Sequence, residues 1–387
     1  SAWMLRLLVH WGQHQQIHVS QFGGDSLREL VSKLHVMDYF VLVWIGLGLV
    51  SLAWAEYQAQ AITELRVLIV EPALLYGVLR YTIRDREAAA RLVSALLLAG
   101  VAVAVAGLIM FVRGEQIITA EAGARRLASV YGSPNNVGLF LGRCVPFALA
   151  FLLVSPDRRG RLLGGLAALV MLTAIALSQS AGAIFLGVPA TIALVLILHW
   201  RKRAWIPLGG LLVVGLLSLA LASQMPRFAR ALDLSEGTNF YRVRVWQSTV
   251  NMIVDRPVTG WGLDQFLYAF RGTYIMPDAW EEPGLSHPHN IVLDQWVRLG
   301  LGGVGLLGAM LYVFWRRLLR LYRQLVQQQD RLLLAMSIGV LGSMFNLLIH
   351  GLVDHSIYVI DLAVVFVLLL ALAVNLPHLT VIDASKR

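Results

Sequence analysis

The sequence contains little cysteine and little charge. Its single cysteine, Cys144, lies inside an apolar run, which excludes an internal disulfide and a thiolate metal cluster but does not settle the redox compartment. Only 14% of the 387 residues are charged, whereas 58% are hydrophobic, above the roughly 45–50% of soluble domains. No internal repeat and no low-complexity tract is recognisable. This composition excludes a soluble globular domain and indicates an integral membrane protein.

Several apolar runs are long enough to cross a bilayer as a helix, which takes about 20 residues. Because the alternation of a β-barrel is not visible, the spans are expected to be helices, whose backbone hydrogen bonds close internally. The predicted fold is an all-α polytopic membrane protein with ten visible spans. The expected spans are 38–55, 62–79, 88–112, 134–154, 162–178, 180–200, 205–222, 291–315, 332–354 and 358–376.

The net charge of +9 comes from short basic clusters between the apolar runs. Such clusters are typical of loops that set membrane topology, so nucleic acid is not expected as a partner. Each cluster follows an even-numbered span of the ten, so all the clusters lie on the same side of the membrane. One orientation of the chain therefore places them all in the cytoplasm. The opposite connections, 113–133, 178–182, 223–290 and 354–358, are then external.

The chain divides into four parts on this topology. Residues 1–36 are expected to hold an interfacial helix or the end of a truncated span, and 37–222 hold transmembrane helices with short loops. Residues 223–290 are the one connection with room for an extramembrane subdomain, which is expected to be partly helical. Residues 291–387 hold the C-terminal spans and a cytoplasmic tail.

The stretch SHPHNI puts two histidines just before an external helix end. Pro288 keeps His287 out of the helical region, and Asn290 is a good N-cap for the span that starts at Ile291. His289 then stands just outside the first turn. Imidazole ionises near neutral pH and suits a general base, but capping of the helix end and binding of a headgroup phosphate are open alternatives.

Two glycines are predicted to lie below this histidine. Counted along an ideal helix from His289, Gly300 and Gly303 fall on nearly the same face. They are expected to admit a neighbouring helix or to leave a groove for a lipid chain. Asp294 and Arg298 have i,i+4 spacing away from this face and are interpreted as a structural pair.

Arginines on the same external side are candidates for binding phosphate. Arg242 and Trp246 share one face of a helix predicted after residue 238, where mutual packing and a phosphate-binding role for Arg242 are both open. Arg125 and Arg126 precede a span and suit an anionic headgroup or a diphosphate, or simply a solvated face.

A polar stripe runs along the last expected turns of span 332–354. Asn346, His350 and Asp354 recur every four residues, which serves either helix packing or a site. A metal site that combines Asp354 and His355 with the two histidines before Ile291 is a further alternative. Because the ligand spacing is not diagnostic, no metal is predicted.

Four motifs resemble the bacterial O-antigen ligase family. HN-IVLDQWVRL-G-LG-G at 289–303 follows its pattern of a histidine, a small polar residue and two spaced glycines. R-VRV-W at 242–246, P-VT-G-W-G at 257–262 and SPNN at 133–136 resemble other elements of the family, in the right order. The family consists of GT-C-like glycosyltransferases of the bacterial inner membrane with about twelve spans, so the resemblance also implies a fold by analogy. Ten spans in this sequence fit a truncated N-terminus.

The resemblance implies a function and roles for individual residues. It implies a metal-independent, cofactor-free, inverting O-antigen ligase that moves O-antigen polysaccharide from undecaprenyl diphosphate to a sugar hydroxyl of lipid A-core, on the periplasmic side. His289 is implied as the base and Arg242 as a diphosphate contact. Ala181 stands where the family commonly has an arginine, so Arg125 or Arg126 is expected to make the second contact. His287, Asn290, Trp246, His350 and Asp354 are expected to support the site or bind the acceptor.

Three alternatives share these features of the sequence. An O-antigen polymerase or a protein O-oligosaccharyltransferase would use the same donor and base with another acceptor. A transporter of a polyprenyl-linked glycan is disfavoured, because broken helices and matched half-repeats are not visible. Membrane lipids are expected around the spans in every case.

Overall fold

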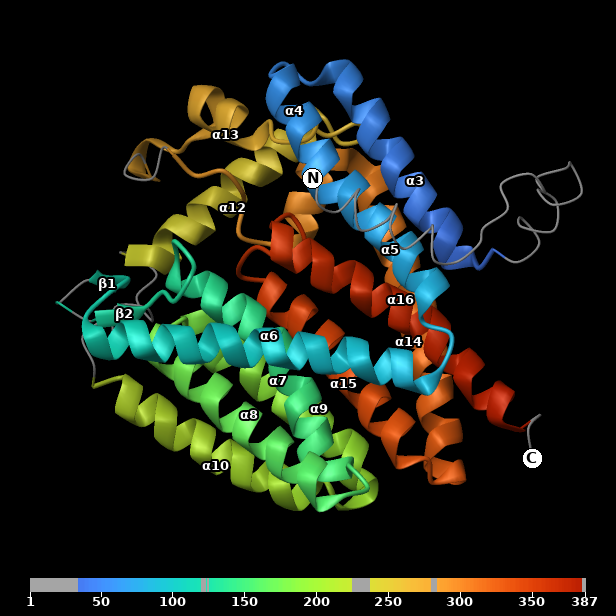
Figure 1. Cartoon of the computed structure of the whole chain (residues 1–387). Coiled ribbons are helices and arrows are strands. Elements are labelled where there is room, and N and C mark those ends of the chain that lie inside the picture. The colour runs from blue at the N-terminus through green and yellow to red at the C-terminus, as the bar shows by residue number, and fades with distance from the viewer. Residues whose placement is uncertain (1–33, 120–122, 124, 225–236, 280–283, 385–387) are drawn as a thin grey trace, which may run out of the picture.

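The computed structural model describes residues 34–119, 123, 125–224, 237–279 and 284–384, which form helices and one short hairpin (Figure 1). The predicted all-α polytopic fold is confirmed, since eight helices among these residues are long and apolar enough to cross a membrane. They are α3 (Val36–Ser51) with η2 (Leu52–Trp54), α6 (Arg86–Arg113), α7 (Pro134–Val154), α8 (Arg158–Ser178), η5 (Gly182–Gly187) with α9 (Val188–Trp200) and η6 (Arg201–Arg203), α14 (Ile291–Gln328), α15 (Arg331–Gly351) and α16 (Ile360–Ala384). The interfacial helix or truncated span expected in 1–36 falls almost wholly outside the described residues.

Two of the ten expected spans are helical but are not among the eight helices that are long and apolar enough to cross a membrane. The span expected at 62–79 lies in a run of α4 (Gln58–Glu64), a π-helix, η3 (Leu65–Val70), and α5 (Glu71–Thr82). Three charged residues, Glu64, Arg66 and Glu71, occur within 62–79. The span expected at 205–222 is α10 (Trp205–Ala222), whose apolar stretch, Trp205–Leu221, is short.

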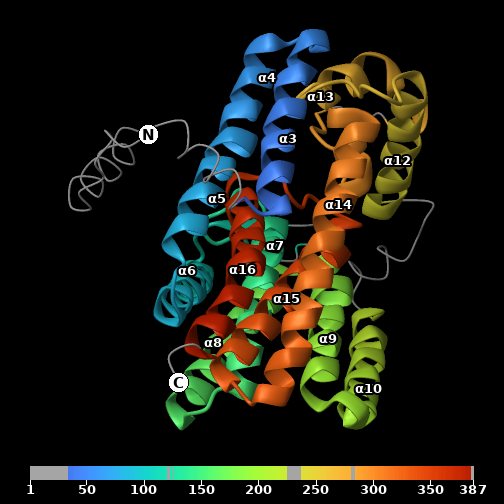
Figure 2. The ribbon, with the colours of Figure 1, turned by 90° about the vertical axis from the view of Figure 1, so that its right-hand side faces the viewer.

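Helices α7, α15 and α16 form the buried centre of the bundle. Their most apolar windows are 78%, 72% and 78% buried, against 22% for α6 and 28% for α8. Helix α7 packs against both α8 and α15. Helix α10 buries none of its described side chains and lies at the periphery beside α9 in Figure 2. Exposed leucines and valines on the outer helices are what a surface that faces lipid requires.

The described part of segment 223–290 packs on one end of α14. It contains α12 (Gly237–Asp255), α13 (Phe266–Ala269), η7 (Phe270–Tyr274) and η8 (Pro277–Ala279). Figure 2 shows α12 and α13 beside the upper end of α14. A small core of Val245, Met252, Phe266 and Phe270 also includes Val297 of α14. The described part of this segment is therefore partly helical and is anchored to the helix that follows the histidines.

Helix α14 is interrupted at Gly300, where φ is 63° and ψ is −161°. The turn at 257–262 fills the interruption, since the Leu301 amide donates to the Pro257 carbonyl (3.1 Å) and the Trp261 amide donates to the Val297 carbonyl (2.7 Å). A Cβ on Gly300 would collide with the Val258 carbonyl. Only glycine combines this positive φ with so close a backbone contact.

This interruption corrects the expectation that no helix is broken, and with it the geometry predicted for the two glycines. The shared face of Gly300 and Gly303 assumed an uninterrupted helix, and that assumption is wrong. Gly300 does admit a close approach, but of the turn at 257–262 rather than of a neighbouring helix. A Cβ on Gly303 would lie 2.5 Å from Leu299 Cβ and 3.1 Å from the Gln295 carbonyl, so Gly303 packs against its own helix.

Candidate active site

Two hydrogen-bonded anchors hold the loop that carries His289. Trp246 Nε1 of α12 donates to the Pro288 carbonyl at 2.9 Å. Asn290 caps α14 as predicted, since its Oδ1 accepts from two amides of the first turn and its Nδ2 donates to the Leu352 carbonyl (3.0 Å). Between these anchors His289 has φ of 50°. A residue with a side chain pays strain of roughly 1–2 kcal/mol in this left-handed region, so the surroundings fix this backbone conformation.

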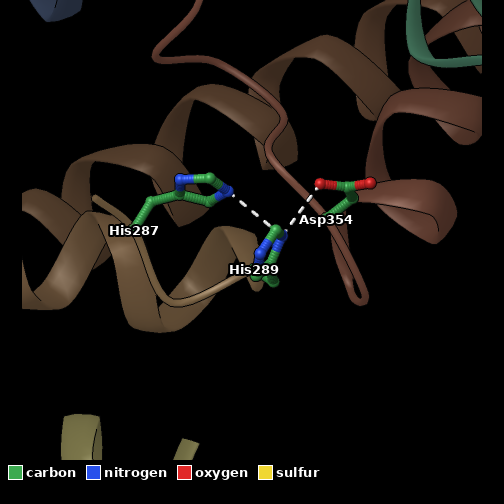
Figure 3. Close-up of side chains that lie close together, drawn as sticks. All are labelled: His287, His289 and Asp354. Carbon is green, nitrogen blue, oxygen red and sulfur yellow. Dashed lines mark hydrogen bonds and ion pairs between the residues drawn. The ribbon is translucent and has the colours of Figure 1, made fainter. Parts of the chain in front are cut away.

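His289 lies between His287 and Asp354 (Figure 3). Its Nδ1 is 3.0 Å from Asp354 Oδ1 and 3.1 Å from His287 Nε2. Asp354 belongs to the connection between α15 and α16, so it lies beyond the helix end at Gly351 and not in the last turn as expected. The structure therefore brings together three of the residues singled out in the sequence, from two separate connections.

The charge on Asp354 determines which nitrogen of His289 carries the hydrogen. Burial opposes ionisation of Asp354, but the hydrogen bond from His289 and the charges of His289 and Arg242 outweigh it and lower the pKa of Asp354. An ionised carboxylate only accepts hydrogen bonds, so the hydrogen is assigned to Nδ1 of His289. Among the described residues no hydrogen bond is made by Nε2 of His289, whose lone pair can therefore accept a proton. This is the arrangement of a general base oriented by a carboxylate.

The histidines behind His289 remain neutral. Burial, followed by the nearby His355 and His289, lowers the pKa of His287 well below its usual range. Burial also lowers the pKa of His355 to about 4. The rings of His287 and His355 lie against each other, and neutral rings add no repulsion to a positively charged His289.

A buried charge network supports this cluster from α14. Arg298 Nε donates to Asp294 Oδ1 at 2.7 Å, as the i,i+4 spacing predicted. Arg298 also bonds Glu64 of α4, and Asp294 Oδ2 lies 3.9 Å from His355 Nδ1. The network thus links α4, α14 and the connection that holds Asp354.

Arg242 lies one helical turn before Trp246 on α12. Its Nη1 donates to Asn239 Oδ1 at 3.3 Å, but its Nε is buried with no hydrogen-bond partner among the described residues. Its charge contributes to the lowered pKa values of His287 and Asp354, so it is within electrostatic reach of both. A guanidinium with a spare buried donor suits a phosphate oxygen.

The other two candidate arginines lie on β2 (Arg125–Leu127), which pairs with β1 (Ile117–Thr119). Arg126 Nε donates to the Ser178 carbonyl, and its Nη2 donates to Asn135 Oδ1, both at 2.9 Å. Arg126 therefore ties the hairpin to the SPNN stretch and to the turn at 178–182. Arg125 is exposed, and its guanidinium lies over the ring of Phe111.

His350 is buried where α15 meets η5. A Cβ on Gly182 would lie 2.8 Å from its Nε2, so the ring rests directly on that glycine. Both ring nitrogens of His350 and the Oγ of Ser180 are buried without a hydrogen-bond partner among the described residues. Unpaired buried polar atoms are costly, so a polar ligand or a water molecule that reached them would be stabilised. Asn346, the next polar residue of the stripe, donates from Nδ2 to Thr191 Oγ1, but its Oδ1 is also buried without a hydrogen-bond partner among the described residues.

Residues 166–308 match the O-antigen ligase family. The predicted resemblance to this family is thereby confirmed for a segment that includes Arg242, Trp246, His287, His289 and Gly300. Members of the O-antigen ligase family are glycosyltransferase-like enzymes. A search of curated proteins finds none that matches the chain.

Two contributors to the site were missed in the sequence. Glu64 is the second carboxylate of the network around Arg298. Arg143 of α7 is fully buried and donates to the carbonyls of Ser356 and Leu362, so it fixes the connection that carries Asp354. An arginine inside an apolar span was the available signal, because ionisable side chains at membrane depth usually have a function.

Proposed function

We propose that the chain is an inverting, metal-independent O-antigen ligase. It would transfer O-antigen polysaccharide from undecaprenyl diphosphate to a sugar hydroxyl of lipid A-core, at the periplasmic face of the inner membrane. The observation that carries this proposal is the contact of His289 with Asp354, which leaves Nε2 of His289 free to accept a proton. The family match over residues 166–308 supports the reaction class.

His289 supplies the base in this mechanism. Its Nε2 removes the proton of the acceptor hydroxyl, and the resulting positive charge on the imidazole is stabilised by Asp354 at 3.0 Å. The acceptor oxygen then forms a bond to the anomeric carbon of the donor from the side opposite the diphosphate. Displacement from that side inverts the configuration of the anomeric carbon.

Arg242 supplies the charge that the leaving group needs. When the bond from the anomeric carbon to oxygen breaks, its electron pair leaves with undecaprenyl diphosphate. A guanidinium placed beside those oxygens stabilises the departing charge much as a metal ion would. The buried Nε of Arg242, with no partner among the described residues, supports this assignment. His350 and Ser180, near the turn at 178–182, offer further polar atoms without a partner among the described residues.

A membrane location for the site suits both substrates. The donor and the acceptor each carry a lipid, so a base at the end of α14 meets sugars while both lipid chains stay in the bilayer. The apolar surfaces of the outer helices, of which α6 and α8 are largely unburied, support this arrangement.

Reconstituted transfer tests the proposed function. Purified protein supplied with undecaprenyl-diphosphate glycan and lipid A-core is expected to form the joined product. A parallel reaction receives a second donor molecule or an acceptor peptide in place of lipid A-core. A longer lipid-linked glycan would show a polymerase, and a glycosylated peptide would show a protein O-oligosaccharyltransferase. No product with any acceptor, from a donor that a known ligase accepts, would refute the proposal.

A further inference from the structure

The three side chains in Figure 3 each present one atom that can bind a metal ion. His287 Nε2, His289 Nδ1 and Asp354 Oδ1 have contacts of 3.1 Å and 3.0 Å, and the ligand atoms of the three residues all lie within 4.8 Å of one another. In a tetrahedral zinc site with bonds of about 2.0–2.1 Å, neighbouring ligand atoms are about 3.3–3.4 Å apart. Small movements of these side chains would therefore complete three corners of such a site.

Hydrogen bonding alone does not satisfy this cluster. His289 Nδ1 faces both Asp354 and His287, but a neutral imidazole has at most one hydrogen on that atom. When that hydrogen points to Asp354, Nδ1 has neither a hydrogen nor a lone pair to offer His287 Nε2. A divalent cation in place of the hydrogen would bind the lone pairs of both imidazoles and the carboxylate oxygen together.

The ligand types identify the class of ion. Two imidazole nitrogens and one carboxylate oxygen suit Zn²⁺ and related transition-metal ions, whereas Mg²⁺ prefers six oxygen ligands. Three protein ligands leave a fourth position for water. Asp354 brings the one negative charge of the three ligands.

We infer that His287, His289 and Asp354 form an inhibitory site for Zn²⁺ or a similar divalent transition-metal ion. The inhibition rests on the proposed function, in which Nε2 of His289 is the base. When a metal ion occupies Nδ1, the single hydrogen of neutral His289 moves through solvent to Nε2. No proton is gained or lost in this exchange, but Nε2 becomes a donor and can no longer take the proton of the acceptor hydroxyl.

Direct binding tests the site without reference to activity. Protein stripped with EDTA and then freed of it is titrated with ZnCl₂ in a calorimeter, with MgCl₂ as the comparison ion. We expect one Zn²⁺ per chain, no saturable Mg²⁺ binding, and at least tenfold weaker Zn²⁺ binding in His287→Gln and in Asp354→Asn. The matched control is His199→Gln, because His199 lies at the far end of α9 with its ring against Trp200. No saturable Zn²⁺ binding, or binding unchanged in both site variants, would overturn the site.

Inhibition is measured in the transfer reaction. Zn²⁺ is expected to stop transfer over the concentration range in which it binds, EDTA is expected to restore the rate, and Mg²⁺ is expected to change nothing. Binding without inhibition would overturn the inhibitory role. If the metal-free chain transfers glycan to no acceptor, the proposed function fails, and the calorimetric titration still decides whether the site exists.

Discussion

Asp354→Asn removes the charge that orients His289 and preserves the size of the side chain. In the wild type the carboxylate accepts from His289 Nδ1 at 3.0 Å in a buried setting. A hydrogen bond to a charged group of this kind contributes about 1.5–3 kcal/mol. Asparagine can also present its NH₂ group to Nδ1, which would place the hydrogen of His289 on Nε2. If this stabilisation is lost in the transition state but not in the ground state, kcat should drop roughly 10- to 150-fold, since 1.36 kcal/mol corresponds to a tenfold change in rate.

The assay is steady-state transfer by the purified protein, with donor and acceptor varied separately. The drop is expected in kcat, with a smaller change in KM for the donor, because Asp354 acts through His289. Asp361→Asn is the matched control, since Asp361 Oδ2 accepts from Tyr131 Oη at 2.8 Å and Asp361 is not bonded to His289. An unchanged kcat in Asp354→Asn, or an equal loss in Asp361→Asn, would refute the role given to the His289–Asp354 contact.

Three further predictions concern the leaving group, the helix interruption and metal removal. Arg242→Gln is expected to reduce kcat/KM for the donor roughly 10- to 100-fold, because a charge-assisted contact with the diphosphate is lost. The control is Arg256→Gln, which removes an arginine whose guanidinium lies over the ring of Trp261 and should change kcat/KM little. Equal losses in the two variants would contradict the role given to Arg242. Gly300→Ala should lower the free energy of unfolding by about 1–3 kcal/mol, because alanine is strained at this positive φ and its Cβ collides with Val258. The loss is measured as a lower melting temperature, whereas Gly305→Ala, whose added Cβ has nothing within 4 Å, should leave the melting temperature unchanged. Equal melting temperatures in the two variants would show that the interruption does not require glycine. Transfer should persist in EDTA, and activity that disappears with EDTA and returns with a divalent cation would overturn the metal-independent mechanism.

Helix locations follow from the sequence because apolar runs are a strong local signal. The eight spanning helices of the described residues lie where long runs with few charges occur. The run at 62–79 differs because it carries Glu64, Arg66 and Glu71. The π-helix in this run does not set it apart, since η5 is also a π-helix and lies inside a spanning helix. The N-cap at Asn290 and the Asp294–Arg298 pair also depend only on local spacing, and both are confirmed.

Contacts between distant segments did not follow from the sequence. The interruption at Gly300 depends on the turn at 257–262, about 40 residues earlier. Helical periodicity is a local pattern and does not predict a contact between segments so far apart in the sequence. Glu64 joins Arg298 across 234 residues of sequence, and no local pattern links them. Asp354 was singled out as part of a helical stripe, but its bond to His289 arises because α15 ends at Gly351 and the chain turns toward the other histidine loop.

His289→Gly tests directly whether His289 is the general base. Glycine tolerates the positive φ at this position, so the loop should keep its conformation. The melting temperature and the affinity for the donor should then stay unchanged. Loss of a general base costs about 10²–10⁴ in rate, and free imidazole added to the variant should restore part of the transfer. Turnover of His289→Gly equal to that of the wild type, with the same donor and acceptor, would show that His289 is not the base.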